Sequence, residues 1–151
     1  MKEGFTLLET LIALAIIVLV AGIILWPYAR FRDEKLLDGA AEDIISLLDE
    51  ARTRTLSSDG ALAYGVSFAS DRITLLPDNR EVILSGRLVI SNINLAGGGT
   101  TVMFKRLTGA TDTGGTVTVN LVSDSNRRRV ITISATGAAG SAGLGLIPTE
   151  S

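Results

Sequence analysis

The sequence contains neither cysteine nor histidine among its 151 residues. Without cysteine the chain has no disulfide and no thiol chemistry, and without histidine it lacks the commonest general base and metal ligand. The net charge is only −2, so no global basic field points to nucleic acid or to an anionic membrane surface. These absences exclude the triads of hydrolases, and the length suits one small domain with one core.

Motifs for phosphate or metal chemistry are also missing. Gly97 to Gly99 lack the lysine and the helix that follow a phosphate-binding loop. Asp71, Asp78, Asp112 and Asp124 each lie in a predicted turn, where aspartate bonds its own backbone, and this interpretation is favoured over calcium binding. The sequence therefore predicts no enzyme activity, no cofactor and no metal.

One long apolar run stands near the N-terminus. From Phe5 to Tyr28 the only charged residue is Glu9, and a run of this length forms about 36 Å of helix, against ~30 Å of bilayer hydrocarbon. The run is therefore long enough to span a membrane, and the charged start Met1–Glu3 is too short for a secretory signal peptide. A carboxylate is costly in hydrocarbon, which indicates that Glu9 has a partner or a function.

Two residues weaken this run as a helix. Gly22 is a poor helix former, and Pro27 lacks the N–H group that would bond to the preceding turn, so we expect a kink near these residues. Trp26 and Tyr28 have amphipathic rings that suit the headgroup region. The membrane exit is therefore predicted near residue 28.

The motif GFTLLE at Gly4–Glu9, followed by the apolar run, resembles the class III signal of type IV pilins and pseudopilins. The resemblance implies cleavage between Gly4 and Phe5 by a prepilin peptidase, methylation of the new Phe5 amine, and a role for Glu9 in packing subunits into a filament. It also implies a single-pass protein of the inner (cytoplasmic) membrane with a periplasmic globular domain. The alternative is an ordinary membrane anchor whose Glu9 reaches back to the headgroups.

After Arg32 the pattern changes to an apolar stripe with helical spacing. Most charged residues lie off this stripe, and Gly60 is suited to the left-handed residue past a helix end. We therefore predict one long helix from Phe5 to about Ser57, with an amphipathic second half. The stripe consists of Leu37, Ala41, Ile44, Leu48, Ala51 and Thr55.

From residue 61 onward, apolar and polar residues alternate in short runs that are typical of strands. The clearest hairpin pairs residues 116–122 with residues 128–135 across a polar turn. The tail 137–151 is rich in glycine and alanine, has little to bury, and is expected to be loosely held. Further strands are expected at residues 61–68, 72–76, 81–84, 87–95 and 101–105.

The predicted fold class is α+β, with a long N-terminal helix whose stripe packs on an antiparallel sheet, as in pilins. The expected divisions are a leader 1–4, a transmembrane or filament-core helix 5–28, a pilin-like globular domain 29–136 and a flexible tail 137–151. The order EAR at residues 50–52, GTV at residues 115–117 and Thr136-Gly137 is similar to the GspH/FimT branch of minor pilins and pseudopilins. That family often has arginine after the late glycine, but Ala138 follows here, which puts a DNA-uptake role in doubt.

Arg127, Arg128 and Arg129 are the only basic cluster in the second half of the chain. One interpretation is a phosphate-binding edge and a candidate nucleic-acid contact. The other is a strand entry in which Arg129 lays its stem over the core and Arg128 is solvated. The strand entry is favoured, because no aromatic stacking platform accompanies the cluster.

The sequence therefore predicts a structural subunit, a pilin or minor pseudopilin of a type IV pilus or a type II secretion-like filament for protein transport. Its expected partners are other pilin subunits, the prepilin peptidase, an inner-membrane assembly platform and the lipid bilayer. The alternative is a DNA-binding minor pilin for DNA uptake, and a membrane-anchored enzyme is the least favoured interpretation.

Overall fold

The structure is a computed structural model of the whole chain, and it describes residues 6–57 and 62–143, without the side chains of residues 24–27, 29, 30 and 143. The chain divides into two compact units, Met1–Lys35 and Leu36–Ser151. We call them the N-terminal unit and the globular unit and describe each by itself.

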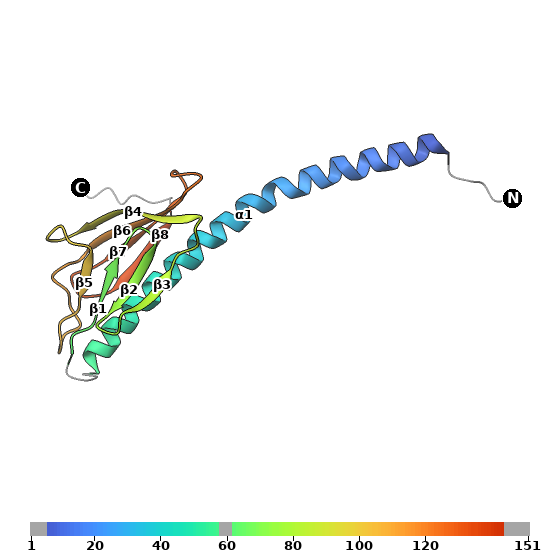
Figure 1. Cartoon of the computed structure of the whole chain (residues 1–151). Coiled ribbons are helices and arrows are strands. Elements are labelled where there is room, and N and C mark those ends of the chain that lie inside the picture. The colour runs from blue at the N-terminus through green and yellow to red at the C-terminus, as the bar shows by residue number, and fades with distance from the viewer. Residues whose placement is uncertain (1–5, 58–61, 144–151) are drawn as a thin grey trace. The chain divides into compact units, whose positions relative to one another are not determined.

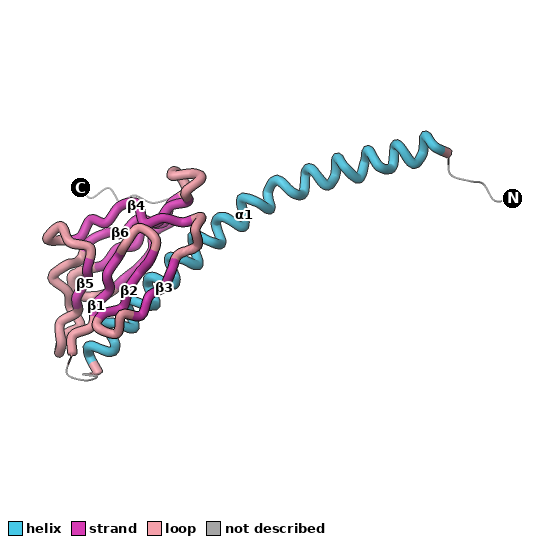
Figure 2. The backbone as a smooth tube through the Cα atoms, in the orientation of Figure 1, coloured by secondary structure: helices cyan, strands magenta, loops and turns pink. Residues whose placement is uncertain are grey.

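One helix, α1, runs through both units. It spans Leu7–Leu56 and is helical without interruption past Gly22 and Pro27 (Figures 1 and 2). The predicted long helix is therefore confirmed within the described residues, while the predicted start at Phe5 lies outside them. The kink expected near Gly22 and Pro27 stays a prediction.

The first turn of α1 is closed by Thr6. Its hydroxyl oxygen accepts a hydrogen bond from the backbone N–H of Glu9 at 3.3 Å, and its carbonyl accepts one from Thr10 at 3.2 Å. Threonine followed three residues later by glutamate is the sequence of a capping box. The helix therefore begins where its own side chains can satisfy the free N–H groups.

Large apolar side chains surround α1 in the N-terminal unit. Among the residues that the structure describes, no helix is both long enough and apolar enough for a membrane crossing. The span predicted at 5–28 includes Phe5 and side chains that lie outside the described part. The large exposed apolar side chains that the structure describes in this unit are Leu7, Leu8, Leu11, Ile12, Leu14, Ile16, Ile17, Val18, Leu19, Val20, Ile23, Tyr28 and Phe31.

The described strands of the globular unit form two antiparallel sheets of four strands each, where the sequence predicts one sheet. Sheet A has the order β3-β2-β1-β5 and sheet B has the order β4-β6-β7-β8. Twisted sheets commonly split into two packed layers as strands are added, so each sheet can bury one face. The strands are β1 Gly65–Phe68, β2 Arg72–Leu76, β3 Arg80–Ile83, β4 Leu88–Leu95, β5 Thr101–Met103, β6 Gly115–Leu121, β7 Arg128–Ile133 and β8 Ala139–Gly143.

The hairpin predicted across residues 123–126 is confirmed as β6 and β7, which pair antiparallel with Val117 opposite Ile131. β1 and β2 form a second hairpin, with Val66 opposite Leu75. The other strands lie within the predicted ranges, apart from small differences at their ends. Figure 2 shows the strands of both sheets gathered beside the second half of α1.

The C-terminal region differs from the expectation of a loosely held tail. Residues 139–143 form β8, which pairs with β7 so that Ala139 lies opposite Ile133 and Gly143 opposite Arg129. Strand pairing is carried by backbone N–H and C=O groups, so a segment of alanine, glycine and serine can complete a sheet without apolar side chains. The rest of the predicted tail, residues 144–151, lies outside the described part.

The core of the globular unit lies between the second half of α1 and the two sheets. All six residues of the predicted stripe are buried, and Ile44, Leu48, Ala51 and Thr55 have no exposed surface. The five apolar residues of the stripe, Leu37 to Ala51, join one cluster with apolar residues of both sheets. The α+β fold class is therefore confirmed. The largest fully buried strand and loop residues are Phe104, Ile73, Leu75, Leu121, Ile131, Val66, Val102, Val117 and Val119.

Candidate functional sites

The candidate assembly residue Glu9 lies in the first turn of α1 and is exposed. A carboxylate in the first turn interacts favourably with the positive end of the helix dipole. The candidate cleavage and methylation residues, Gly4 and Phe5, lie outside the described residues. The arrangement therefore places Glu9 at the end of the helix, next to the segment where processing is expected.

The three adjacent arginines do not form one patch. Arg129 places its Nε and Nη2 atoms 2.8 Å from Oδ1 of Asp38 on α1, and its side chain is only 22% exposed. Arg128 is exposed, because neighbouring residues of a strand point to opposite faces. The strand-entry interpretation predicts this arrangement, in which Arg129 binds a carboxylate of α1 and Arg128 is solvated.

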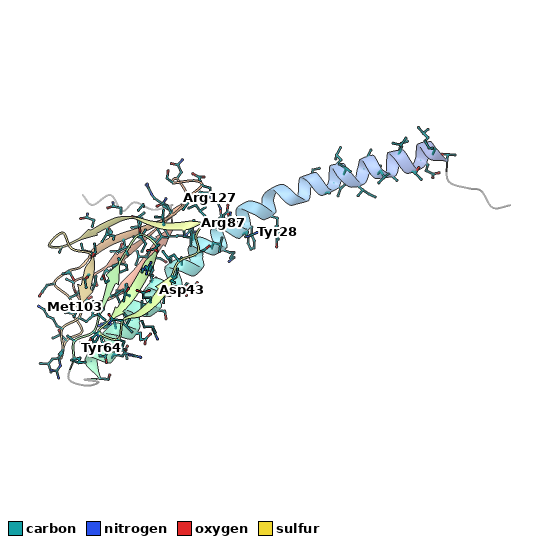
Figure 3. All side chains as sticks on the ribbon, in the orientation of Figure 1. Tyr28, Asp43, Tyr64, Arg87, Met103 and Arg127 are labelled. Carbon is teal, nitrogen blue, oxygen red and sulfur yellow. The ribbon has the colours of Figure 1, made fainter. Side chains whose placement is uncertain are left out.

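Another arginine, which sequence reasoning missed, lies near this cluster. The backbone N–H of Val122 donates to the carbonyl of Arg87 at 2.9 Å, and that of Leu121 donates to the carbonyl of Arg127 at 3.2 Å. Arg87 and Arg127 therefore lie at the same end of sheet B (Figure 3). No local pattern could reveal this, because the two residues are brought together by the pairing of β4 with β6.

A shallow polar cavity of about 510 Å³ opens over sheet B. Asn120 is 6% exposed, and its Oδ1 atom has no hydrogen-bond partner among the residues that the structure describes, while its Nδ2 atom donates to the carbonyl of Leu121 at 3.1 Å. Arg128 is the one charged residue that lines this cavity. None of the lining residues is aromatic. The lining residues are Ser91, Asn92, Thr116, Thr118, Asn120, Ser125, Asn126, Arg128 and Val130.

Two glycines of the GspH/FimT-like pattern allow close approach of backbone segments. A Cβ atom on Gly137, which has φ +82°, would lie 1.9 Å from the carbonyl oxygen of Gly109. That same oxygen accepts a hydrogen bond from Nε of Arg52 at 3.2 Å. A Cβ atom on Gly115 would lie 2.1 Å from the carbonyl oxygen of Asn94. Gly137 therefore allows the β5–β6 loop to pack closely against it, and Gly115 allows the close approach of β4 and β6.

Ion pairs attach the end of α1 to the turn between β2 and β3. Glu50 pairs with Arg54 at 3.0 Å and also with Arg80, and Arg54 pairs with Asp78. Burial lowers the pKa of Arg54, but the carboxylates of Glu50 and Asp78 outweigh this and leave that pKa raised. Arg54 also lies 5.6 Å from the ring centre of Tyr64. This network is structural, since every group in it has a partner.

The carboxylates of the aspartates in the predicted turns also have partners within the chain. Hydrogen bonds from Arg72, at 3.0 and 3.2 Å, lower the pKa of Asp71. Asp112 pairs with Lys105 at 2.7 Å, and Oδ1 of Asp124 accepts a hydrogen bond from the backbone of Asn126. Among the described residues, no group of three or more acidic side chains is placed to hold a metal ion.

Comparison with known proteins identifies the family. Residues 40–137, more than half of the chain, match the family of the type II transport protein GspH. The chain belongs to the GspH family. Residues 1–25 match the prokaryotic N-terminal methylation motif. Comparison with curated proteins gives no match.

Two crystal forms of the type IV minor pilin FimU from Pseudomonas aeruginosa strain PAO1 have a similar fold. One has a TM-score of 0.53 and covers 70% of this chain and 92% of the FimU chain. The other has a TM-score of 0.55, with 73% and 90% covered. The sequence identity is 17% in both, so this likeness concerns the fold.

Family and fold together define the type of protein. The chain is a structural subunit of the pilin and pseudopilin type, and subunits of this type assemble with one another into filaments. They are not enzymes. The predicted recognition and the predicted structural role are therefore confirmed, while nothing specific supports the DNA-binding alternative.

Proposed function

We propose that this GspH-family subunit is made with the leader 1–4, is cut between Gly4 and Phe5 by a prepilin peptidase, and is methylated on the Phe5 amine. The observation that carries this proposal is the methylation motif matched over residues 1–25. Glu9 in the first turn of α1 supports it, because that position is four residues, or about 6 Å of helix, from the new amine.

The apolar surface of the N-terminal unit supports a role in assembly. Exposed apolar side chains lie on consecutive residues from Ile16 to Val20, so no side of the helix is polar. An apolar patch that runs around a helix is unusual on a soluble monomer and marks an interaction surface. In the proposal, residues 5–28 sit in the inner membrane before assembly and in the filament core afterwards.

Glu9 would then act as the partner of the Phe5 amine of a neighbouring subunit. Between apolar helices an unpaired charge is strongly disfavoured, whereas a pair is tolerated. The pair would therefore select the axial register of the incoming subunit. In the proposal an inner-membrane assembly platform brings the subunits together, and the globular domain lies on the periplasmic side.

The GspH match favours a secretion-type filament over a pilus. The description of that family as a type II transport protein supports a minor subunit that serves protein transport. The likeness to FimU concerns the fold alone, so it does not separate the two machines. A secretion assay in a strain that lacks this subunit would distinguish them, because loss of secretion with normal pili is the expected result.

Processing is tested by the substitution Gly4→Leu, which removes the residue type that the peptidase is expected to need. Intact mass of wild-type protein from membranes should correspond to a chain that starts at Phe5 and carries one methyl group. Gly4→Leu should retain residues 1–4. The matched control is Gly22→Leu, because a side chain at Gly22 meets nothing within 4 Å and should leave cleavage intact. A wild-type chain that keeps Met1 would refute the proposal.

A further inference from the structure

The polar cavity over sheet B lies on the face of the sheet that is turned away from the core. Val117 and Val119 of β6 are buried in the core, and neighbouring residues of a strand point to opposite faces. Thr118 and Asn120 therefore point outward, and Asn92 of β4, which lies opposite Thr118, shares their face. Packing of the core thus does not determine which side chains line this cavity.

Two local features shape the cavity. The register of β4 against β6 shifts at Ser91, which is an extra residue of β4. Bulges of this kind are frequent beside functional sites, where they redirect side chains. The turn between β6 and β7 adds Ser125 and Asn126 to the lining. The cavity is therefore bounded by a bulge and by a polar turn, both of which are irregular parts of the sheet.

Asn120 is the strongest indication of a ligand in this cavity. Its side chain is only 6% exposed, and its Oδ1 atom has no partner among the described residues, although a buried acceptor that is left unpaired is costly. The carbonyl of Leu121, which binds Nδ2 of Asn120, also accepts a hydrogen bond from the backbone N–H of Asp124 at 3.3 Å. The amide of Asn120 can therefore turn toward a bound group without leaving that carbonyl unpaired.

The chemistry of the lining defines the class of ligand. Arg128 is exposed and has no ion pair within the described residues, so its guanidinium can bind one carboxylate through two hydrogen bonds. Asn92, Asn120 and Asn126 each carry a carboxamide, which offers a donor and an acceptor, as a peptide group does. Without an aromatic residue a nucleic-acid base has no stacking platform, and one arginine is too few for a chain of phosphates. These groups therefore suit a polypeptide with an acidic side chain.

We propose that this cavity binds an extended segment of a partner protein that carries one acidic side chain. The carboxylate pairs with Arg128, and a backbone N–H of the segment donates to Oδ1 of Asn120. The cavity spans β4, β6 and β7, which are two strand spacings or about 10 Å, and this matches about three residues of extended chain. The site lies on the face of sheet B opposite to the core, so this binding is separate from the proposed assembly through residues 5–28.

The first test measures the preference for a carboxylate. The full-length protein in detergent is titrated with acetyl-Ser-Asp-Ser-amide and with acetyl-Ser-Asn-Ser-amide, which has the same shape without the charge, and the NMR signals of the asparagine side chains report binding. The aspartate peptide should bind about tenfold more tightly, and Arg128→Gln should abolish this preference. The matched control is Arg106→Gln, which changes an exposed arginine outside the cavity and should retain the preference.

Two results of this titration would overturn the proposal. One is equal affinity for the two peptides, or no saturable binding of either. The other is tighter binding of a trigalacturonate than of the aspartate peptide, which would assign the site to acidic sugars. Neither result depends on filament assembly, so the proposed function would stand in both cases.

The second test separates binding from folding. Asn120→Val removes the unpartnered oxygen and introduces a residue that suits a strand, so it should keep or raise the thermal midpoint of the globular unit. The affinity for the aspartate peptide should nevertheless fall about tenfold, because the backbone N–H of the peptide loses its acceptor. The matched control is Asn94→Val, because Asn94 is exposed on β4 but does not line the cavity. Wild-type affinity in Asn120→Val would overturn the proposal, and if this variant does not fold, the Arg128→Gln comparison decides.

Discussion

The two parts of α1 differ in what surrounds them. Between Leu7 and Ile23, the large apolar side chains are 46–79% exposed, whereas the apolar residues Leu37, Ile44 and Leu48 are at most 1% exposed. Both parts belong to one unbroken helix, so helical structure and packing are determined separately. The second part is held by the sheets of its own chain, and the first part offers its surface to other molecules.

The strongest test of this difference is Glu9→Leu. In a filament the Phe5 amine would lose its carboxylate, which should cost about 3–5 kcal/mol in assembly. The globular unit should keep its wild-type unfolding midpoint, because Glu9 lies outside its core. The measurement compares the amount of variant protein in membranes with the amount in sheared filaments.

Glu9→Gln is the matched control for the capping role of this residue. Glutamine can still complete a capping box with Thr6, but it carries no charge. If the charge pair matters, Gln should be as defective in assembly as Leu. Normal incorporation of the Gln variant would instead assign Glu9 to helix capping.

A somewhat smaller effect is expected from truncating the same residue type in both parts of α1. Leu48→Ala removes a side chain with no exposed surface, so it should lower the free energy of unfolding by about 2–5 kcal/mol. Leu14 is 60% exposed, and Leu14→Ala should leave that free energy unchanged. Chemical denaturation of the two full-length variants in detergent measures this, and equal losses would mean that the core extends into the first part of the helix.

The sequence was enough to locate α1 and the strands before β8, because their signals are local. The stripe from Leu37 to Thr55 repeats with the helical period, and β6 and β7 alternate on either side of a polar turn. Two features depended on distant partners. The split into two sheets follows from pairings such as β1 with β5, and β8 contains no apolar alternation that could mark it as a strand.

The candidate sites show the same limit. The motif at Gly4–Glu9 is read directly from adjacent residues. In contrast, the bond between Arg129 and Asp38 joins residues that are 91 positions apart, and the unpartnered Oδ1 atom of Asn120 is a property of the folded sheet. Sequence could indicate that Arg129 belongs to a strand entry, but it could not identify the carboxylate that binds it.

The smallest expected effect concerns the ion pair between Asp71 and Arg72, which is exposed and takes no part in the packing of α1 against the sheets. Hydrogen bonds from Arg72 lower the pKa of Asp71, and the two side chains are 42% and 58% exposed, respectively. Because the folded-state pKa lies below the unfolded value, the native state binds fewer protons in this range. The contribution of this ion pair to the stability of the fold is therefore fully present above about pH 4, and it is lost as the pH falls through the depressed pKa of Asp71.

Asp71→Asn should remove this part of the acid dependence of stability. Arg72→Gln should remove the same part, because the hydrogen bonds from Arg72 are what lower the pKa of Asp71. Thermal midpoints measured from pH 6 downward test this, and an acid dependence that survives in both variants would show that other carboxylates determine it.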